Sequence, residues 1–187
     1  WDIVNNSSLG EMGSVERAPT LASYSGLMAL MMNLTDPVDV MVASLLADIG
    51  MLELPPKTTQ KIRQSLGIET LNTEEIEFYR KHPSVSLQRI LDKRLSMNDK
   101  LRDMILCTHE KADRTGFPEG RNGDRIPMPA QLIQFCDLVD KASMVRFGQA
   151  RIHISKVRED MIKRELQNAQ TFTYQFLQKL KPLVLDQ

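Results

Sequence analysis

Apolar residues recur at helical spacing along most of this chain. Leu21, Tyr24 and Met28 lie three or four positions apart, which places them on one face of a helix. The same spacing predicts helices over much of the sequence, and these cover residues 19–34, 37–50, 57–66, 72–81, 84–93, 98–112, 129–146 and 155–180. No segment alternates in the manner of a strand. The pattern therefore predicts an all-α protein.

Two local signals predict how the helix near the middle of the chain begins and ends. Asn72 followed by Glu75 resembles a capping box, in which each side chain accepts a hydrogen bond from the backbone of the other residue. The His82-Pro83 pair should interrupt the helix, because proline lacks the backbone N–H that a helix uses. We therefore expect one helix to end at about residue 81 and another to begin at Ser84.

Composition and charge narrow the class of protein. At 187 residues the chain is long enough for one domain with a well-buried core. Its 24 lysines and arginines balance 24 aspartates and glutamates, which argues against a nucleic-acid polymer as a main partner. No run of about 18 apolar residues exists, so we expect no membrane insertion. Cys107 and Cys136 fall within predicted helices and predict free thiols in a reducing compartment, the cytoplasm.

Five short motifs carry most of the chemistry of this chain. They are Ala47-Asp48-Ile49-Gly50-Met51, His82-Pro83, Thr108-His109-Glu110, Asp113-Arg114-Thr115-Gly116-Phe117-Pro118 and Asp137-Leu138-Val139-Asp140. In this order they resemble the motif series of the HD-GYP phosphodiesterases, which use metal ions to hydrolyse the bacterial second messenger cyclic di-GMP. The resemblance implies an HD-domain helical bundle with a long Gly/Pro-rich GYP-type loop.

The resemblance also suggests a division of the chain. We expect a degenerate HD-GYP domain at residues 17–148 and a C-terminal helical extension of the same domain at residues 149–187. The chain begins with Trp1 and not with methionine. We therefore expect residues 1–16 to be an N-terminal segment that links to a missing upstream domain.

Four residues match metal-ligand positions of the family: Asp48, His82, His109 and Asp137. A metal-dependent phosphohydrolase needs histidines and carboxylates that converge from several helices. Two imidazoles and a carboxylate can hold one divalent iron, manganese or zinc ion. The resemblance makes Asp48 the bridging ligand and, in an active domain, the catalytic residue. The alternative is a hydrogen-bonded remnant that binds no cofactor.

Other positions of the family's active centre hold residues that bind metal poorly or not at all. Ala47 and Thr108 stand where the family has ligand histidines, and a further ligand histidine falls near Arg17. Met51 stands where the family has a lysine that helps to hold the substrate. A methyl group has no lone pair, and a hydroxyl is a weak ligand for transition metals. Because two metals together clamp the attacking and leaving oxygens, we expect efficient hydrolysis to be lost.

The loop at residues 113–129 contains three glycines and three prolines, which predicts a long, structured connection. Gly116 predicts a backbone conformation that other residues resist, and Pro118 stiffens the turn. Phe117 lacks the hydroxyl of the family's tyrosine. The resemblance implies that Gly116, Phe117 and Pro118 form an interaction loop for partner domains. A simple cap over the helix bundle is the alternative.

Two arginines are candidate phosphate contacts. Arg146 falls where the family has an arginine that contacts nucleotide phosphate, and Arg114 replaces a glycine of the loop motif. A guanidinium group can bind phosphate through two parallel hydrogen bonds. The alternatives are a cation at a helix C-terminus for Arg146 and a change of the local turn for Arg114.

Three functions remain open at this point. The lost ligands favour a pseudoenzyme: a catalytically impaired or inactive HD-GYP-type signalling domain that acts through protein partners, GGDEF-type domains among them, and senses cyclic di-GMP. The alternative is an active single-metal phosphodiesterase that hydrolyses cyclic di-GMP or another phosphoester. The third is a homodimerisation domain built on the methionine-rich stretch at residues 28–32, since methionine packs adaptably.

Overall fold

The computed structural model describes residues 14–34, 36–65, 68–143 and 153–185, and every regular element in these ranges is a helix. The all-α prediction is therefore confirmed. The α-helices are α2 (Ser14–Met32), α3 (Pro37–Leu46), α4 (Pro56–Ser65), α5 (Thr73–Asp92), α6 (Asp99–Cys107), α7 (Met128–Ser143), α8 (Ile154–Gln167) and α9 (Tyr174–Val184), and two 3₁₀ turns are η1 (Ile49–Glu53) and η2 (Gly123–Arg125).

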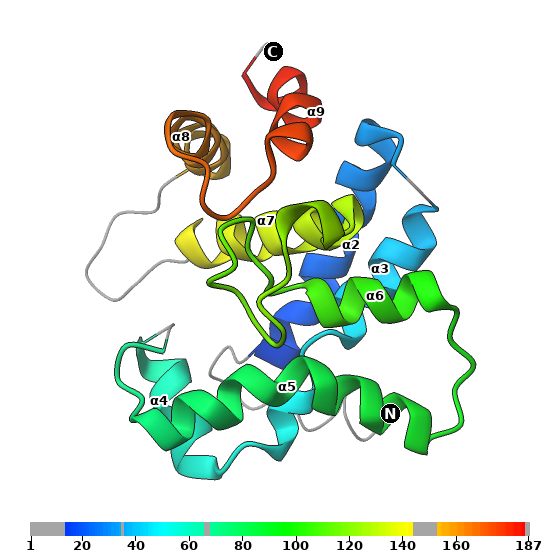
Figure 1. The fold of residues 1–187 in the computed structure, drawn as a ribbon, viewed down its shortest axis with the longest axis vertical. Coiled ribbons are helices and arrows are strands. Elements are labelled where there is room, and N and C mark those ends of the chain that lie inside the picture. The colour runs from blue at the N-terminus through cyan, green and yellow to red at the C-terminus, as the bar shows by residue number, and fades with distance from the viewer. Residues whose placement is uncertain (1–13, 35, 66–67, 144–152, 186–187) are drawn as a thin grey trace.

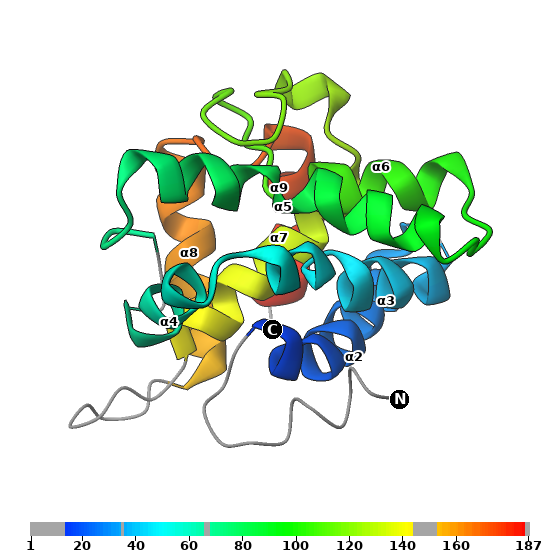
Figure 2. The same ribbon diagram turned by 90° about the horizontal axis from the view of Figure 1, so that it is seen from below.

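Helix α7 is the centre of the bundle. It contacts α2, α3, α6 and α8, while α5 and α6 lie on one side of it and α8 and α9 on the other (Figures 1 and 2). All eight residues from Ala130 to Asp137 are buried, which is expected for a helix covered on every face. Three buried rings join α7 to the C-terminal part of the chain, and their centroids lie 5.2 to 6.4 Å apart: Phe135, Phe172 and Phe176.

The single helix expected over residues 155–180 is wrong, because the chain forms α8 and α9 with a turn between them. The carboxylate of Glu165 accepts hydrogen bonds from the backbone N–H groups of residues 170–172 and so holds this turn. Phe172, within the turn, is buried in the core. Apolar periodicity continues across the break because the turn itself contributes to the core.

The expected interruption at His82-Pro83 is also wrong. Helix α5 runs through both residues, with Pro83 in its interior. A proline inside a helix removes one backbone hydrogen bond but does not always end the helix. The capping box at the start of this helix is confirmed, since the side chains of Asn72 and Glu75 each accept a hydrogen bond from the other's backbone N–H.

The chain between α6 and α7 is a long loop held from the inside by Glu110. This side chain is fully buried, and its two oxygens accept hydrogen bonds from the backbone N–H groups of Glu119 (2.7 Å) and Arg121 (2.8 Å). The loop is tied to the turn between α8 and α9 as well, because two of its backbone N–H groups donate to the carbonyls of residues 170 and 171.

Gly116 is required for a different reason from the one expected. Its φ lies outside the left-handed range, and only Gly120 among the described glycines has a positive φ, of 64°. A Cβ atom on Gly116 would instead lie 2.3 Å from the backbone nitrogen of Lys111 and 2.5 Å from Cα of Glu110. The glycine thus allows the loop to pack directly on the backbone that leaves α6.

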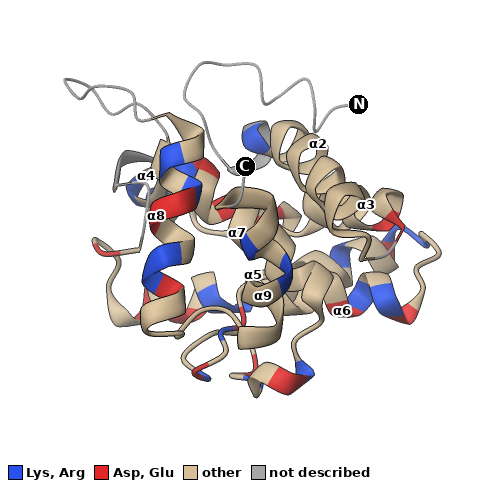
Figure 3. Ribbon diagram, turned by 90° about the horizontal axis from the view of Figure 1, so that it is seen from above, with Lys and Arg blue, Asp and Glu red and all other residues tan. Residues whose placement is uncertain are grey.

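Helices α2 and α3 carry few charged residues, and their ribbons are almost entirely tan in Figure 3. Within the methionine-rich stretch, Met28 and Met32 are buried in the core while Met31 is half-exposed. Homodimerisation through this stretch stays a prediction. No helix of the described residues is long and apolar enough to cross a membrane.

We predict that Glu110→Gln lowers the free energy of unfolding by about 1–3 kcal/mol, because glutamine offers one acceptor oxygen where two backbone N–H groups need one each. Urea unfolding followed by circular dichroism measures this, with the exposed Glu77→Gln as the control. A loss no larger than that of the control would show that the Glu110 carboxylate does not hold the loop.

Candidate metal centre

Three of the predicted ligands converge from separate segments of the chain. Asp48 lies just after α3, His82 lies inside α5 and His109 lies in the turn after α6. One ligand atom from each of them can be chosen so that all three atoms lie within 4.8 Å of one another. Nε2 of His82 lies 3.3 Å from Oδ1 of Asp48, and Nε2 of His109 lies 3.4 Å from the same oxygen. We call this group the Asp-His-His cluster.

Ser86 fixes the position of Asp48 relative to α5. Its hydroxyl donates to the carbonyl of Ala47 (2.6 Å) and accepts from the backbone N–H of Gly50 (2.8 Å). Gly50 packs so closely on α5 that a Cβ atom would lie 2.2 Å from the carbonyl oxygen of His82. The backbone on both sides of Asp48 is therefore bound to the helix that carries His82.

Pro83 helps to orient His82. In an unbroken helix the N–H of residue 83 would donate to the carbonyl of residue 79, but proline has no N–H. The carbonyl oxygen of Tyr79 instead lies 2.6 Å from Nδ1 of His82. Because a carbonyl can only accept, Nδ1 carries the proton, and in the neutral ring Nε2 then keeps its lone pair. A backbone carbonyl on the second nitrogen is the usual support of a metal-binding histidine.

The free lone pair of His82 fits a metal ion. Its Nε2 atom is buried and lacks a geometrically acceptable hydrogen bond to any described residue, although the Asp48 oxygen lies nearby. A buried polar atom without a partner is uncommon in folded proteins and calls for an explanation. Two imidazole nitrogens and one carboxylate are a common ligand set for zinc, iron or manganese. The cluster could therefore hold one divalent cation.

The charges of the cluster suit such an ion. Burial opposes ionisation of Asp48, but its contacts with His109 and His82 hold the pKa of this carboxyl group well below its usual range. Burial lowers the pKa of His109 and outweighs the opposing effect of its contact with Asp48. An ionised carboxylate beside a neutral imidazole is the protonation state that a metal requires.

Aromatic rings enclose the cluster. The ring of Phe117 stacks on His109 with centroids 4.9 Å apart and planes inclined by 19°, and it meets the edge of His82 at 5.8 Å. Tyr79 packs against both His82 and Phe117. The loop residue Phe117 is therefore a wall of the cluster, and its two neighbours Gly116 and Pro118 are only partly exposed. Their role in binding a partner stays a prediction.

The fourth predicted ligand, Asp137, does not join this group and is bound to two cations instead. The Arg17 guanidinium lies 3.1 Å from its Oδ1 atom, and Lys141 Nζ lies 2.6 Å from its Oδ2 atom. Arg17 also forms an ion pair with Asp140, with Nε 2.6 Å from Oδ2. Although burial opposes it, the carboxylates of Asp137 and Asp140, with a smaller contribution from Asp48, raise the pKa of Arg17.

Lys141 was not singled out in the sequence, although its spacing of four residues from Asp137 on one helix is the signal that could have shown it. Burial opposes its charge, yet Asp137, Tyr79 and Asp48 raise its pKa. Arg17 and Lys141 thus place two permanent cations beside the Asp-His-His cluster.

The other substituted positions are occupied by side chains that pack in the structure. Ala47 and Met51 are buried, and the hydroxyl of Thr108 donates to the carbonyls of Met104 and Ile105 inside its own helix. Arg114 lies on the loop surface, away from the cluster residues. Arg146 lies outside the described residues.

We predict that Pro83→Ala weakens binding of zinc or manganese roughly ten- to a hundredfold, because the new N–H competes with His82 for the Tyr79 carbonyl. Isothermal titration of the metal into the chelator-treated protein measures this. Pro182 is also inside a helix, α9, but is far in sequence from any ligand, so Pro182→Ala is the matched control and should leave metal affinity unchanged. Equal affinities for both variants would contradict a role for Pro83.

The sequence and the fold of this chain are similar to those of known proteins. The chain is 29% identical over 163 residues to a 3'3'-cGAMP-specific phosphodiesterase of Vibrio cholerae, a match that covers 82% of this chain and 32% of that protein. It is 30% identical over 115 residues to a cyclic di-GMP phosphodiesterase of Pseudomonas aeruginosa, covering 60% of this chain and 26% of the relative. The chain spans about a third or less of the length of these curated relatives.

Two solved structures share the fold. One is Bd1817, an HDG"Y"P protein from Bdellovibrio bacteriovorus, with a TM-score of 0.64 and 18% identity over 91% of this chain and 52% of that one. The other is the HD domain of the L. monocytogenes phosphodiesterase PgpH in complex with cyclic-di-AMP, with a TM-score of 0.65 and 14% identity over 100% of this chain and 94% of that one. A model of the HD domain family matches residues 3–168, and on this evidence the chain belongs to the HD domain family.

Proposed function

We propose that this domain binds one divalent metal ion at the Asp-His-His cluster and recognises a cyclic dinucleotide, and that its ability to hydrolyse the phosphoester is impaired or lost. Recognition of a cyclic dinucleotide is supported by the names of the relatives, which act on 3'3'-cGAMP or cyclic di-GMP, and by the L. monocytogenes domain in complex with cyclic-di-AMP. Metal binding is supported by the unpartnered Nε2 atom of His82.

The observation that carries the proposal is the pairing of Arg17 with Asp137 and Asp140. A second metal ion would need carboxylate oxygens on this side of the cluster, and here a guanidinium and the Lys141 ammonium already neutralise them. Displacing either cation would cost free energy, because separating a buried ion pair leaves a charge without compensation.

Fixed side-chain cations and a bound metal ion act differently on a phosphoester. A bound divalent ion would lower the pKa of its water and polarise a phosphate oxygen. Arg17 and Lys141 can attract and orient a phosphate but offer no empty coordination position for a nucleophile. Phe117 packs on His109 and Tyr79 packs on Phe117, and apolar surroundings of this kind strengthen both attractions. These residues therefore favour binding over turnover.

A signalling role follows from binding without turnover. We place such a domain in the cytoplasm as a receptor module that passes the nucleotide signal to protein partners, GGDEF-type domains among them, through the loop at Gly116-Phe117-Pro118. The two buried free thiols, Cys107 and Cys136, suit that reducing compartment.

The second candidate function is an active single-metal phosphodiesterase. It is favoured by the completeness of the Asp-His-His cluster, since two histidines and one carboxylate leave open positions on a metal for water and substrate. The two candidates differ only in what happens to the nucleotide after it binds.

We predict that cyclic di-GMP binds saturably in the presence of manganese and is recovered intact. Titration calorimetry measures the binding, and chromatography of the same solution detects products. Asp48→Ala should abolish manganese binding and weaken nucleotide binding at least about tenfold, because the attraction between the ion and the phosphate is lost. The exposed Asp99→Ala is the control. Hydrolysis products that disappear in Asp48→Ala would establish the second candidate, and the absence of both manganese and nucleotide binding would contradict both candidates.

We further predict that Arg17→His combined with Ala47→His raises the manganese content from one to two ions per chain. The double change frees the carboxylates of Asp137 and Asp140 and supplies one imidazole at position 17 beside them and another at position 47 next to Asp48. Metal analysis of the dialysed protein measures the content, and circular dichroism checks the fold. Ala47→His alone should stay at one ion because Arg17 still binds the carboxylates. One ion in the double variant would contradict the assignment of Arg17 to the second cation position.

A further inference from the structure

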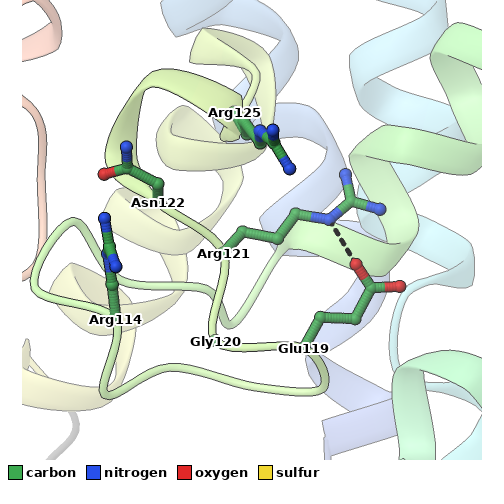
Figure 4. A pocket seen from close by; sticks show the side chains of 6 residues that line it. All are labelled: Arg114, Glu119, Gly120, Arg121, Asn122 and Arg125. Atoms are coloured by element: carbon green, nitrogen blue, oxygen red, sulfur yellow. Dashed lines mark hydrogen bonds and ion pairs between the residues drawn. The ribbon is translucent and has the colours of Figure 1, made fainter.

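Three arginines of the loop between α6 and α7 surround a hollow of about 580 Å³. Its lining is Arg114, Glu119, Gly120, Arg121, Asn122 and Arg125, and we call it the arginine pocket (Figure 4). No residue of the Asp-His-His cluster lines it. Its volume is within the range of pockets that bind small molecules. The arginine pocket is therefore separate from the candidate metal centre.

The lining carries three guanidinium groups and a single carboxylate. Arg121 donates to Glu119 through Nε (2.7 Å) and contacts Asp103 and the sulfur of Cys107, so its charge is compensated. Among the residues that the structure describes, the guanidinium groups of Arg114 and Arg125 have no hydrogen bond or ion pair. Because the whole chain is neutral, this excess of positive charge is a local feature and not a consequence of overall basicity.

The backbone that carries these side chains is fixed before any ligand arrives. The buried Glu110 carboxylate binds the N–H groups of Glu119 and Arg121, and Gly120 turns the chain with φ of 64°. Arg114 itself has φ of 68°, a left-handed conformation that side chains other than glycine, asparagine and aspartate rarely adopt. The N–H of Arg114 donates to the carbonyl of Lys111 (2.9 Å), so a local turn holds this conformation.

We propose that the arginine pocket binds a phosphate-bearing ligand of about nucleotide size, independently of the metal centre. Guanidinium groups match the oxygens of phosphate through two parallel hydrogen bonds each, and they need no metal to do so. Arg114 and Arg125 supply these donors, Asn122 also lines the pocket with its amide, and Arg121 is paired with Glu119. The proposal goes beyond the proposed function, because it requires neither metal binding nor a cyclic dinucleotide.

The experiment is a titration of inorganic pyrophosphate into the full chain in the presence of EDTA, which removes metal from the Asp-His-His cluster. We expect saturable binding that weakens at least tenfold in the double variant Arg114→Ala/Arg125→Ala. The control is Arg80→Ala/Lys93→Ala, which removes the same charge from exposed positions of α5 and its C-terminal end, and it should bind as the unaltered chain does.

Three outcomes would overturn the proposal. One is the absence of saturable binding in EDTA, and another is an equal loss in both double variants, which would reduce the effect to net charge. The third is binding of a poly-glutamate peptide without binding of pyrophosphate, which would assign the pocket to an acidic protein segment. Manganese binding by Arg114→Ala/Arg125→Ala should equal that of the unaltered chain, so a failure here is distinguishable from a failure of the metal site.

Discussion

The neutralisation of buried carboxylates is the constraint on which the centre of this molecule depends. An ionised carboxyl group inside a protein needs a cation or several hydrogen-bond donors. Asp48 faces two imidazoles, Asp137 faces Arg17 and Lys141, and Glu110 accepts two backbone N–H groups. Each of these contacts joins separate segments. Asp48 joins the end of α3 to α5, Asp137 joins α7 to α2, and Glu110 joins the start of the long loop to its middle. The arrangement of the helices and the chemistry of the site therefore have the same cause.

The carboxylates of Asp48 and Asp137 differ in whether they already face a fixed cation. Neighbouring carboxylates raise the pKa of Arg17, so its charge is permanent and the Asp137 side of the site is closed to other cations. The lowered pKa of His109 makes its ring neutral at physiological pH, which leaves the charge of Asp48 available to an incoming ion. A site with one fixed and one exchangeable positive charge still attracts phosphate. In the function proposed above, it would lack the pair of metal ions that distributes charge between attacking and leaving oxygens.

Much of the fold was predictable from the sequence, and the errors have local causes. The capping box at Asn72 was visible because it depends on two residues three positions apart. The break between α8 and α9 was not visible, because Phe172 in the turn continues the apolar periodicity. The side chain of Glu165 stabilises this turn through hydrogen bonds to its backbone. Pro83 suggested a helix end, since a sequence cannot show that the freed carbonyl of Tyr79 finds a new donor three residues away.

The predicted metal ligands also show that a sequence pattern does not reveal contacts between distant residues. Asp48, His82 and His109 do converge, whereas Asp137 lies with Arg17, a pairing across 120 residues that no local pattern reveals.

The turn after α6 shows how closely the two sites of the molecule are built together. His109 and Glu110 are consecutive, yet His109 belongs to the Asp-His-His cluster while Glu110 holds the backbone of the arginine pocket. The same loop returns through Gly116, which packs on the backbone of Glu110, and places the ring of Phe117 on His109. One conformation of the loop backbone therefore positions residues of both sites. A substitution that displaces residues 109–110 would disturb the Asp-His-His cluster and the backbone of the arginine pocket together.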